Sequence, residues 1–422
     1  MITDILYRCP ECGEFEWLED GRCRHCRVPV RVLSRKNVAV DGQSGDIAYW
    51  YAKVRGHALP QATDGMILHS GRVRLSREIQ KGRFKGLSGV YAIRYGREFM
   101  TEGSIALYSD RLVFPGASFR ESIPFECISA VTIESNTVIV DRTDARTVYI
   151  DFQEESGKKW EDCIQKAIAR FFSPAEIVEF CPKIRFAQPS SKKPERAVGH
   201  HDIRVRAQKW YRSDFPPASS LLKRIAACLA DGLLDIEFTG MENIPSRGAA
   251  ILAANHVSFL DGIILAACLP RVVRFMTKNS QFNTPVMRVI LKLGGTFPVK
   301  RYRTDVVAVR NALRVLQHGH VLGVFPEGER SWDGRMQPFK KGTLRLMMAA
   351  GKPVVPVGIS GIYELMPRWT TTFRRVPVRI TVGEPLRFTV NPIGCQTEED
   401  IATADERLRR TIETLIIPLA QV

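Results

Sequence analysis

The chain has 422 residues, enough for two or three domains that each bury a hydrophobic core. Hydrophobic residues make up 45% and charged residues 25%, which excludes collagen-like, coiled-coil and wholly disordered proteins. The 61 Lys and Arg against 45 Asp and Glu give a net charge of +16. We therefore expect a negatively charged partner, such as nucleic acid, anionic lipid or a phosphorylated small molecule.

Four of the ten cysteines lie at the start of the chain, as the pairs Cys9/Cys12 and Cys23/Cys26. Two such knuckles supply four thiolates for one tetrahedral Zn²⁺, and because all ligands are sulfur the ion would be structural. Two short-range disulfides or coincidence are the alternatives. Residues 1–32 thus resemble a zinc ribbon, which binds nucleic acid or protein in some chains and only caps a neighbouring domain in others.

Residues 33–180 are expected to form a β-rich module, although no clear pattern runs through residues 30–95 and its start is uncertain. A hairpin is predicted from residues 105–108 and 111–114, followed by strands at 128–133, 137–140 and 147–152. A helix is predicted at 157–172. This element order resembles a pleckstrin-homology or GRAM-like module, which would bind anionic lipid; a protein-binding or spacer role stays open.

A basic linker is predicted at 181–215, where nine basic and three acidic residues between 182 and 214 give +6. It is either a solvated tether or a contact for a membrane or nucleic acid. Residues 219–234 follow with apolar residues at helical spacing. Such a helix lies on a membrane surface or packs on its own domain.

Residues 216–422 are expected to form an α/β domain with a largely parallel sheet flanked by helices. The predicted strands are 250–253, 321–325, 354–359 and 378–382. The most apolar window, 249–270, contains His256 and Asp261, so we interpret it as buried core that carries polar chemistry rather than a membrane span.

His256 and Asp261 are five residues apart. On a continuous helix that spacing is a rotation of about 140°, so the two side chains can meet only across a turn into a helix. Asp261 then fixes the imidazole tautomer and leaves His256 as a general base. In the alternative, Ser258 caps the helix with Asp261 at the capping-box position.

Three further blocks follow in a fixed order, after an approach segment at 240–245 (GMENIP). They are 294–301 (GGTFPVKR), 325–331 (FPEGERS) and 354–358 (VVPVG). With the His256 block, residues 216–400 resemble the glycerophospholipid acyltransferase family, which includes the 1-acylglycerol-3-phosphate acyltransferases.

The resemblance implies an O-acyltransferase of phospholipid biosynthesis that moves a fatty acyl group from acyl-CoA or acyl-ACP to the hydroxyl of a lysophosphatidic-acid-like acceptor. His256 would be the general base and Asp261 its orienting partner. Substrate-binding residues would be Arg301 on the phosphate, with Glu327, Gly328 and Arg330 shaping the same site. Lys340 and Lys341 would receive phosphates of coenzyme A or of the headgroup, or are merely solvated.

The expected location is the cytoplasm, peripherally associated with the inner face of a membrane. No transmembrane helix is expected, because no run of about 18 uncharged apolar residues occurs.

Two residues depart from the family blocks. Lys300 stands where an acid is usual, and Glu329 stands where Thr is usual. Glu329 needs Lys300 or another cation beside it, or an acceptor with a partly cationic headgroup. A different lipid acceptor is therefore one alternative. The other is a zinc-ribbon regulator that binds nucleic acid or lipid through an inactive acyltransferase domain; because His256 and Asp261 are intact, nucleic acid is not the expected partner.

Overall fold

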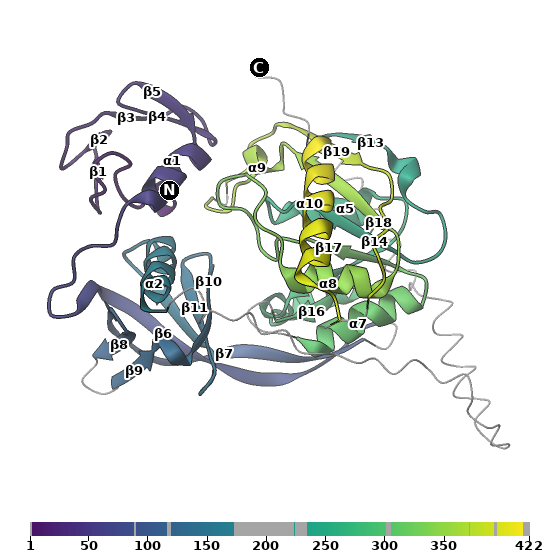
Figure 1. Cartoon of the computed structure of the whole chain (residues 1–422), viewed down its shortest axis with the longest axis horizontal. Helices are drawn as coiled ribbons and strands as arrows, with labels where there is room; N and C mark the ends of the chain where they lie inside the picture. Colours follow the sequence, from purple (N-terminus) through teal and green to yellow (C-terminus); the bar gives the residue numbers. More distant parts are fainter. Residues whose placement is uncertain are drawn as a thin grey trace.

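The computed structural model describes residues 2–87, 90–115, 120–172, 223, 234–300, 305–370, 372–391 and 395–416. Within them, an N-terminal cysteine-bearing segment and an antiparallel module lie beside an α/β domain (Figure 1). The basic linker predicted at 181–215 lies outside the described residues, and so does the helix predicted at 219–234 apart from Lys223.

The N-terminal segment consists of short antiparallel strands and one helix. It contains η1 (Ile2–Asp4), β1 (Leu18–Glu19), β2 (Arg22–Cys23), β3 (Val30–Val32), β4 (Asn37–Val40), β5 (Gln43–Asp46) and α1 (Ile47–Gly56). These elements share one core around Trp17 and Trp50, whose indole N–H groups donate to the Leu6 and Val38 carbonyls. The cysteines are thereby fixed to a small folded unit that continues to α1.

The middle module is a seven-stranded antiparallel sheet in the order β10-β11-β12-β6-β7-β8-β9, followed by α2 (Gly157–Phe171). Its elements are β6 (Met66–Lys85), β7 (Tyr91–Tyr108), β8 (Arg111–Pro115), β9 (Arg120–Pro124), η3 (Phe125–Cys127), β10 (Ile128–Glu134), β11 (Thr137–Arg142) and β12 (Val148–Phe152). The predicted hairpin, strands and helix from residue 105 onward are confirmed. Trp160 and Ile164 of α2 are fully buried in the core of this sheet.

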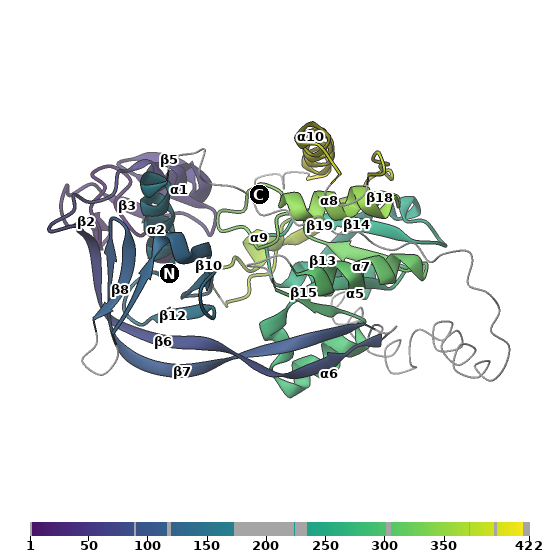
Figure 2. The same cartoon turned by 60° about the horizontal axis from the view of Figure 1, so that its bottom comes forward.

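The β6–β7 hairpin is one of the features that the sequence did not predict. It extends out of the module and runs beneath the α/β domain (Figure 2). There, Phe84 packs edge-on against Phe282, with ring centroids 4.8 Å apart, and Val90 joins the same core cluster as Ile251. Asn311 also donates to the Tyr91 carbonyl at 2.8 Å. The hairpin is thus part of the hydrophobic core of the α/β domain.

The α/β domain is built on a seven-stranded sheet in the order β13-β19-β18-β14-β17-β15-β16. Its strands are β13 (Asp235–Thr239), β14 (Ala250–Ala254), β15 (Val273–Lys278), β16 (Phe297–Val299), β17 (Val321–Val324), β18 (Val354–Ser360) and β19 (Pro377–Val382). All pairings are parallel except β18–β19, so the sheet expected to be largely parallel is mixed, with the β19–β13 pair reversed. The four strands predicted in this domain are confirmed.

Helices cover both faces of this sheet. They are η4 (Met241–Asn243), α5 (Leu260–Cys268), η5 (Asn279–Phe282), α6 (Pro285–Leu293), α7 (Val306–Gln317), α8 (Lys341–Ala350), α9 (Ile362–Leu365) and α10 (Glu398–Leu415). One core cluster contains residues of α7, α8 and α10, and the other contains residues of α5 and α9. None of the helices in the described part of the chain is long and apolar enough to cross a membrane.

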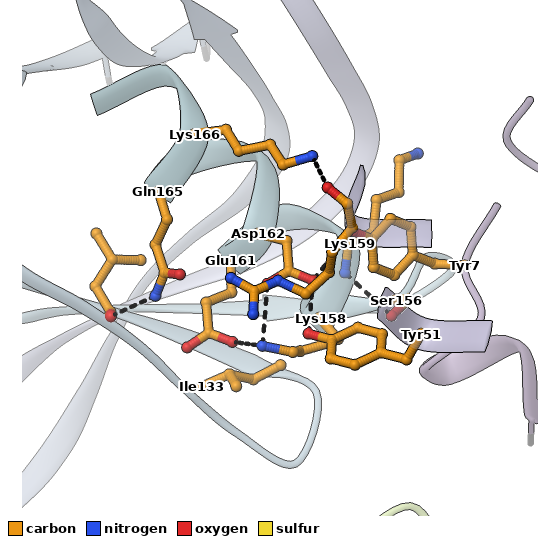
Figure 3. A network of polar contacts seen from close by, with 12 residues as sticks. Tyr7, Tyr51, Ile133, Ser156, Lys158, Lys159, Glu161, Asp162, Gln165 and Lys166 are labelled. Atoms are coloured by element: carbon orange, nitrogen blue, oxygen red, sulfur yellow. Dashed lines mark hydrogen bonds and ion pairs between the residues drawn. The ribbon is translucent and has the colours of Figure 1, made fainter. Parts of the chain in front are cut away.

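A buried polar network joins the N-terminal segment to α2 (Figure 3). The Asp162 carboxylate accepts from the Tyr7 hydroxyl at 3.0 Å and the Tyr51 hydroxyl at 2.8 Å. Lys158 pairs with the other Asp162 oxygen at 3.1 Å and with Glu161. Burying a polar group without a partner costs free energy, so this network favours the contact between the N-terminal segment and α2.

Candidate active site

His256 and Asp261 meet at the carboxyl end of β14. The strand ends at Ala254 and α5 begins at Leu260, so the turn between them brings His256 Nδ1 to 2.8 Å from Asp261 Oδ2. This confirms that the two side chains meet across a turn into a helix. Since a carboxylate only accepts, Nδ1 carries the proton, and Nε2 of the neutral imidazole is then the basic nitrogen.

Asp261 also holds the turn. Its Oδ2 accepts from the backbone N–H of Val257 at 2.7 Å and of Ser258 at 2.9 Å, and the residue is fully buried. Of the expected capping box, the bond from the Ser258 N–H to Asp261 is present, but α5 has Phe259 at its N-cap with no side-chain cap, and the Ser258 hydroxyl donates to the Met366 carbonyl at 2.9 Å. The same carboxylate therefore shapes the backbone and orients the imidazole.

Glu327 fixes the backbone of His256. Its buried carboxyl accepts from the His256 N–H at 2.7 Å and from the Gln337 N–H at 2.8 Å. The Ser331 N–H donates to the His256 carbonyl at 2.8 Å, so both backbone groups of His256 are bonded to the 325–337 loop. Burial raises the pKa of Glu327 to about 8, against the opposing effect of the two N–H groups. Phe325 stacks on the imidazole at 4.0 Å between centroids.

A cavity of about 970 Å³ opens at His256. Much of its wall is apolar and comes from α5, β15 and α6, as with Ile263, Phe275 and Leu291. Charged side chains line the remainder: Glu134, Lys223, Lys278, Glu329, Arg330, Lys340 and Arg368. One cavity thus offers an apolar channel and a charged region next to a histidine.

The predicted substrate-binding residues separate into four groups, one of which is Glu327, which bonds the His256 backbone and is not among the cavity-lining residues. Gly328, Arg330 and Lys340 line the cavity; Gly328 has φ +76° and a Cβ there would lie 2.9 Å from Lys340 Cγ. Lys341 instead pairs with Glu398 of α10 at 2.9 Å and is not among the lining residues. Arg301 lies outside the described residues.

Arg368 is the cation beside Glu329, at 3.1 Å between Nη1 and Oε2. Burial acts to raise the pKa of Glu329, but the charges of Arg368, Lys158 and Lys340 outweigh it and hold the pKa below its usual value. Lys300 pairs with Glu78 of the hairpin at 2.7 Å. The cation that neutralises Glu329 is therefore Arg368, which lies in none of the sequence blocks, and not Lys300.

The four N-terminal cysteines converge as predicted. All four Sγ atoms lie within 4.8 Å of one another, and the pairs Cys9–Cys26 and Cys12–Cys23 are 3.7 Å apart. A tetrahedral zinc site with Zn–S bonds of about 2.3 Å has edges of about 3.8 Å, whereas a disulfide measures about 2.05 Å. The donor set and its dimensions fit a four-thiolate metal site, and the disulfide alternative is wrong.

Comparison with known proteins shows what the region around this site is similar to. Residues 235–360 match the family model described as Acyltransferase. A chloroplastic 1-acyl-sn-glycerol-3-phosphate acyltransferase of Brassica napus is 32% identical over 154 residues, which cover 36% of this chain and 44% of the relative. The enzyme of the same name from Bacillus subtilis is 25% identical over 182 residues, covering 43% of this chain and 88% of the relative.

Among solved structures, PlsC, the 1-acyl-sn-glycerophosphate acyltransferase of Thermotoga maritima, matches with 28% identity and a TM-score of 0.41. The match covers 52% of this chain and 85% of that chain. The chain spans slightly less than half the length of the Brassica napus relative, at 44%, and of a chloroplastic enzyme of the same name from Arabidopsis thaliana, at 46%. The region around His256, residues 235–360, thus matches the Acyltransferase family model. Its resemblance to the 1-acylglycerol-3-phosphate acyltransferases, first inferred from the sequence blocks, is confirmed.

Proposed function

We propose that the chain is an O-acyltransferase that moves a fatty acyl group from a thioester donor, acyl-CoA or acyl-ACP, to the hydroxyl of a lysophosphatidic-acid-like acceptor. The observation that carries the proposal is the His256–Asp261 pair at a cavity that is partly apolar and partly charged. An acyl chain needs the apolar wall, and a phosphorylated headgroup needs the cations. The names of the relatives support the same reaction.

In the proposed reaction His256 Nε2 takes the proton of the acceptor hydroxyl as the oxygen attacks the thioester carbonyl carbon. The tetrahedral intermediate collapses with cleavage of the C–S bond, so the products are an ester and a thiol. The proton on His256 then passes to the departing thiolate or to solvent. Asp261, bonded to Nδ1, stabilises the imidazolium that forms.

The headgroup would lie near Arg330 and Lys340, which line the charged region of the cavity. Arg368 is largely neutralised by Glu329 and is less suited to a second anion. Guanidinium and ammonium groups both bind phosphate oxygens. This arrangement supports a phosphorylated acceptor without identifying its further substituents, so an acceptor panel belongs in the first experiment.

That experiment measures thiol release from a long-chain acyl-CoA by the full chain, with and without lysophosphatidic acid. We expect release that depends on the acceptor and is lost in His256→Ala. The matched control is His69→Ala, an exposed histidine on β6, which should behave as wild type. Release that persists in folded His256→Ala contradicts the mechanism, and salt-dependent DNA binding without any release favours the regulator alternative.

We also propose that the domain works at a membrane surface. Five large apolar side chains are at least 40% exposed at the N-cap of α5 and on α5 and α6: Phe259, Ile263, Val286, Val289 and Ile290. Three of them, Phe259, Ile263 and Ile290, also line the cavity, so the patch adjoins the route by which a lipid would enter. Contiguous exposed apolar surface of this kind marks interaction sites.

A vesicle flotation assay tests the membrane proposal. The double variant Val286→Ser/Val289→Ser should weaken binding to vesicles at least tenfold, because each buried Val contributes about 1.5 kcal/mol or more. Val390→Ser is the control, since Val390 is 61% exposed elsewhere on the same domain. Equal flotation of both variants contradicts the assignment of the surface.

The four cysteines are proposed to hold a structural Zn²⁺. Cys9, Cys12, Cys23 and Cys26 would each supply one thiolate, which leaves no position for a substrate. The bound ion would stabilise the N-terminal segment, which α2 then positions through Asp162. The division of the chain into domains and the lipid-binding role of the middle module remain predictions.

A further inference from the structure

The cavity has a wall that does not belong to the acyltransferase-family domain. Residues 130–134 of β10 and Gln165 of α2 line it together with His256, yet the family match covers only residues 235–360. The middle module therefore contributes directly to the candidate active site, and its contribution is not explained by the family.

The position of β10 accounts for this. It is an edge strand of the seven-stranded sheet, and its side chains alternate between two faces. Ile133 is buried in the core of the N-terminal segment, whereas Glu134 pairs with Lys278 at the end of β15. Thr132 shares the face of Glu134, so it is directed to the side on which the α/β domain lies.

Arg368 connects this wall to the loop that holds His256. Its guanidinium donates to the Ile133 carbonyl at 2.6 Å and to the Arg330 carbonyl at 2.7 Å, while it pairs with Glu329. The same group lies 4.3 Å over the Trp332 ring, and its side chain is 4% exposed. One buried arginine thus ties β10 to the 325–331 block.

Thr132 is the polar side chain of this wall that is left for a substrate. Glu134 is engaged by Lys278 and by Arg97, and the Gln165 amide donates to the Val131 carbonyl at 3.4 Å. No hydrogen bond among the described residues uses the Thr132 hydroxyl, and the residue is half-buried. A hydroxyl placed in this way can donate to a phosphate oxygen of a ligand.

We propose that β10 forms one wall of the acceptor site, where Thr132 contacts the phosphate-monoester headgroup of a single-chain lipid and Arg368 is the positioning residue that holds the wall in place. The inference rests on the proposed acyl transfer and deepens it. It also accounts for Glu329, because the acid that replaces the usual Thr anchors Arg368 rather than touching the headgroup.

The first test is Thr132→Val, which removes the hydroxyl and keeps the shape of the side chain. A hydrogen bond to a charged group has a magnitude that corresponds to about a tenfold change in binding. We expect the KM for lysophosphatidic acid to rise about tenfold while the KM for acyl-CoA is unchanged. Selectivity over a monoacylglycerol, which lacks the phosphate, should fall by a similar factor.

Thr101→Val is the matched control, because Thr101 is a half-buried threonine of the same module and its hydroxyl is bonded to the Glu102 carbonyl. It should leave both KM values unchanged. An acceptor KM in Thr132→Val equal to that of wild type overturns the inference. A wild-type chain with no acceptor-dependent thiol release would instead overturn the proposed function, and the inference with it.

The second test examines Arg368 as a positioning residue. Arg368→Lys keeps the charge but cannot reach Ile133, Arg330 and Glu329 together, so the acceptor KM should rise. Combined with Thr132→Val, the effects should be less than additive, since both act through the same wall. Arg379→Lys, which alters an exposed ion pair with Glu237, is the control. Fully additive effects overturn the positioning role; if Arg368→Lys does not fold, Thr132→Val alone decides.

Discussion

Replacing Asp261 by Asn separates the two roles of this carboxylate. Oδ2 accepts three hydrogen bonds, from Val257, Ser258 and His256, and the buried Oδ1 has no hydrogen-bond partner among the described residues. The amide oxygen of Asn can take the place of Oδ2, and its NH₂ group then takes the place of Oδ1. The turn and the imidazole tautomer are retained, but the negative charge is lost.

The expected loss of kcat in Asp261→Asn follows from the 2.8 Å separation of His256 Nδ1 and Asp261 Oδ2. Two unit charges at that distance interact with roughly 6 kcal/mol at an effective dielectric constant of 20. In the proposed reaction His256 becomes charged only as it takes the proton, so this interaction would lower the barrier rather than the ground state. At about 1.4 kcal/mol for each factor of ten, its loss reduces kcat by up to about 10⁴. Partial screening by the two backbone N–H groups sets a lower expectation of about 10².

The assay is thiol release at saturating acyl-CoA and lysophosphatidic acid, with thermal unfolding measured on the same samples. Asp261→Asn should unfold within a few degrees of wild type. The control is Asp400→Asn, where the carboxylate likewise accepts a backbone N–H bond, from Thr397, at a helix start but lies far along the chain in α10. A kcat for Asp261→Asn within twofold of wild type would refute the electrostatic role of the carboxylate.

Three further changes have defined outcomes. Burial raises the pKa of Glu327 from 4.5 to about 8, so the folded state disfavours the ionised form of this carboxyl. The stability that the protonated form contributes is present below pH 4.5 and is lost as the pH rises through 8. The unfolding free energy of Glu327→Gln should therefore fall less steeply than that of wild type over this range, and parallel curves for the two proteins contradict this. Cys12→Ser should abolish the single bound zinc measured by elemental analysis, whereas Cys127→Ser should retain it. Gly328→Ala forces a side chain into φ +76° and should cost about 1–3 kcal/mol in thermal unfolding, while Gly342→Ala, with nothing within 4 Å of its Cβ, should not.

The parts of the structure that could be predicted are those that a pattern of neighbouring residues in the sequence specifies. Alternating and helical periodicities identified the module from residue 105 onward and four strands of the α/β domain. The His256 spacing predicted a meeting across a turn, because a continuous helix would separate the side chains. Cysteine spacing predicted the thiolate cluster, since a knuckle brings two sulfurs together within a few residues.

The remaining features depend on contacts between distant segments. The β6–β7 hairpin has register shifts between Met66 and Leu68, Ser70 and Val73, Leu75 and Ser76, and Gln80 and Gly82. Each shift breaks the two-residue alternation by which a strand is recognised. Arg368 carries no motif, and its role depends on Glu329 and on an edge strand more than 200 positions earlier. The same holds for Lys341, whose motif position did not reveal its ion pair with Glu398.

The embedding of β6–β7 in the α/β core sets an order on folding during synthesis. Tyr91 contacts Asn311 across 220 positions of sequence, and Phe84 packs against Phe282. At about 5–20 residues per second, the tip of the hairpin waits roughly 10–45 s for its partners to leave the ribosome. Until then Phe84 and Val90 are exposed on a long two-stranded ribbon, which is only marginally stable alone. Completion of the α/β domain therefore depends on a segment made long before it, and a chain trimmed to residues 235–360 would expose Phe282 to water.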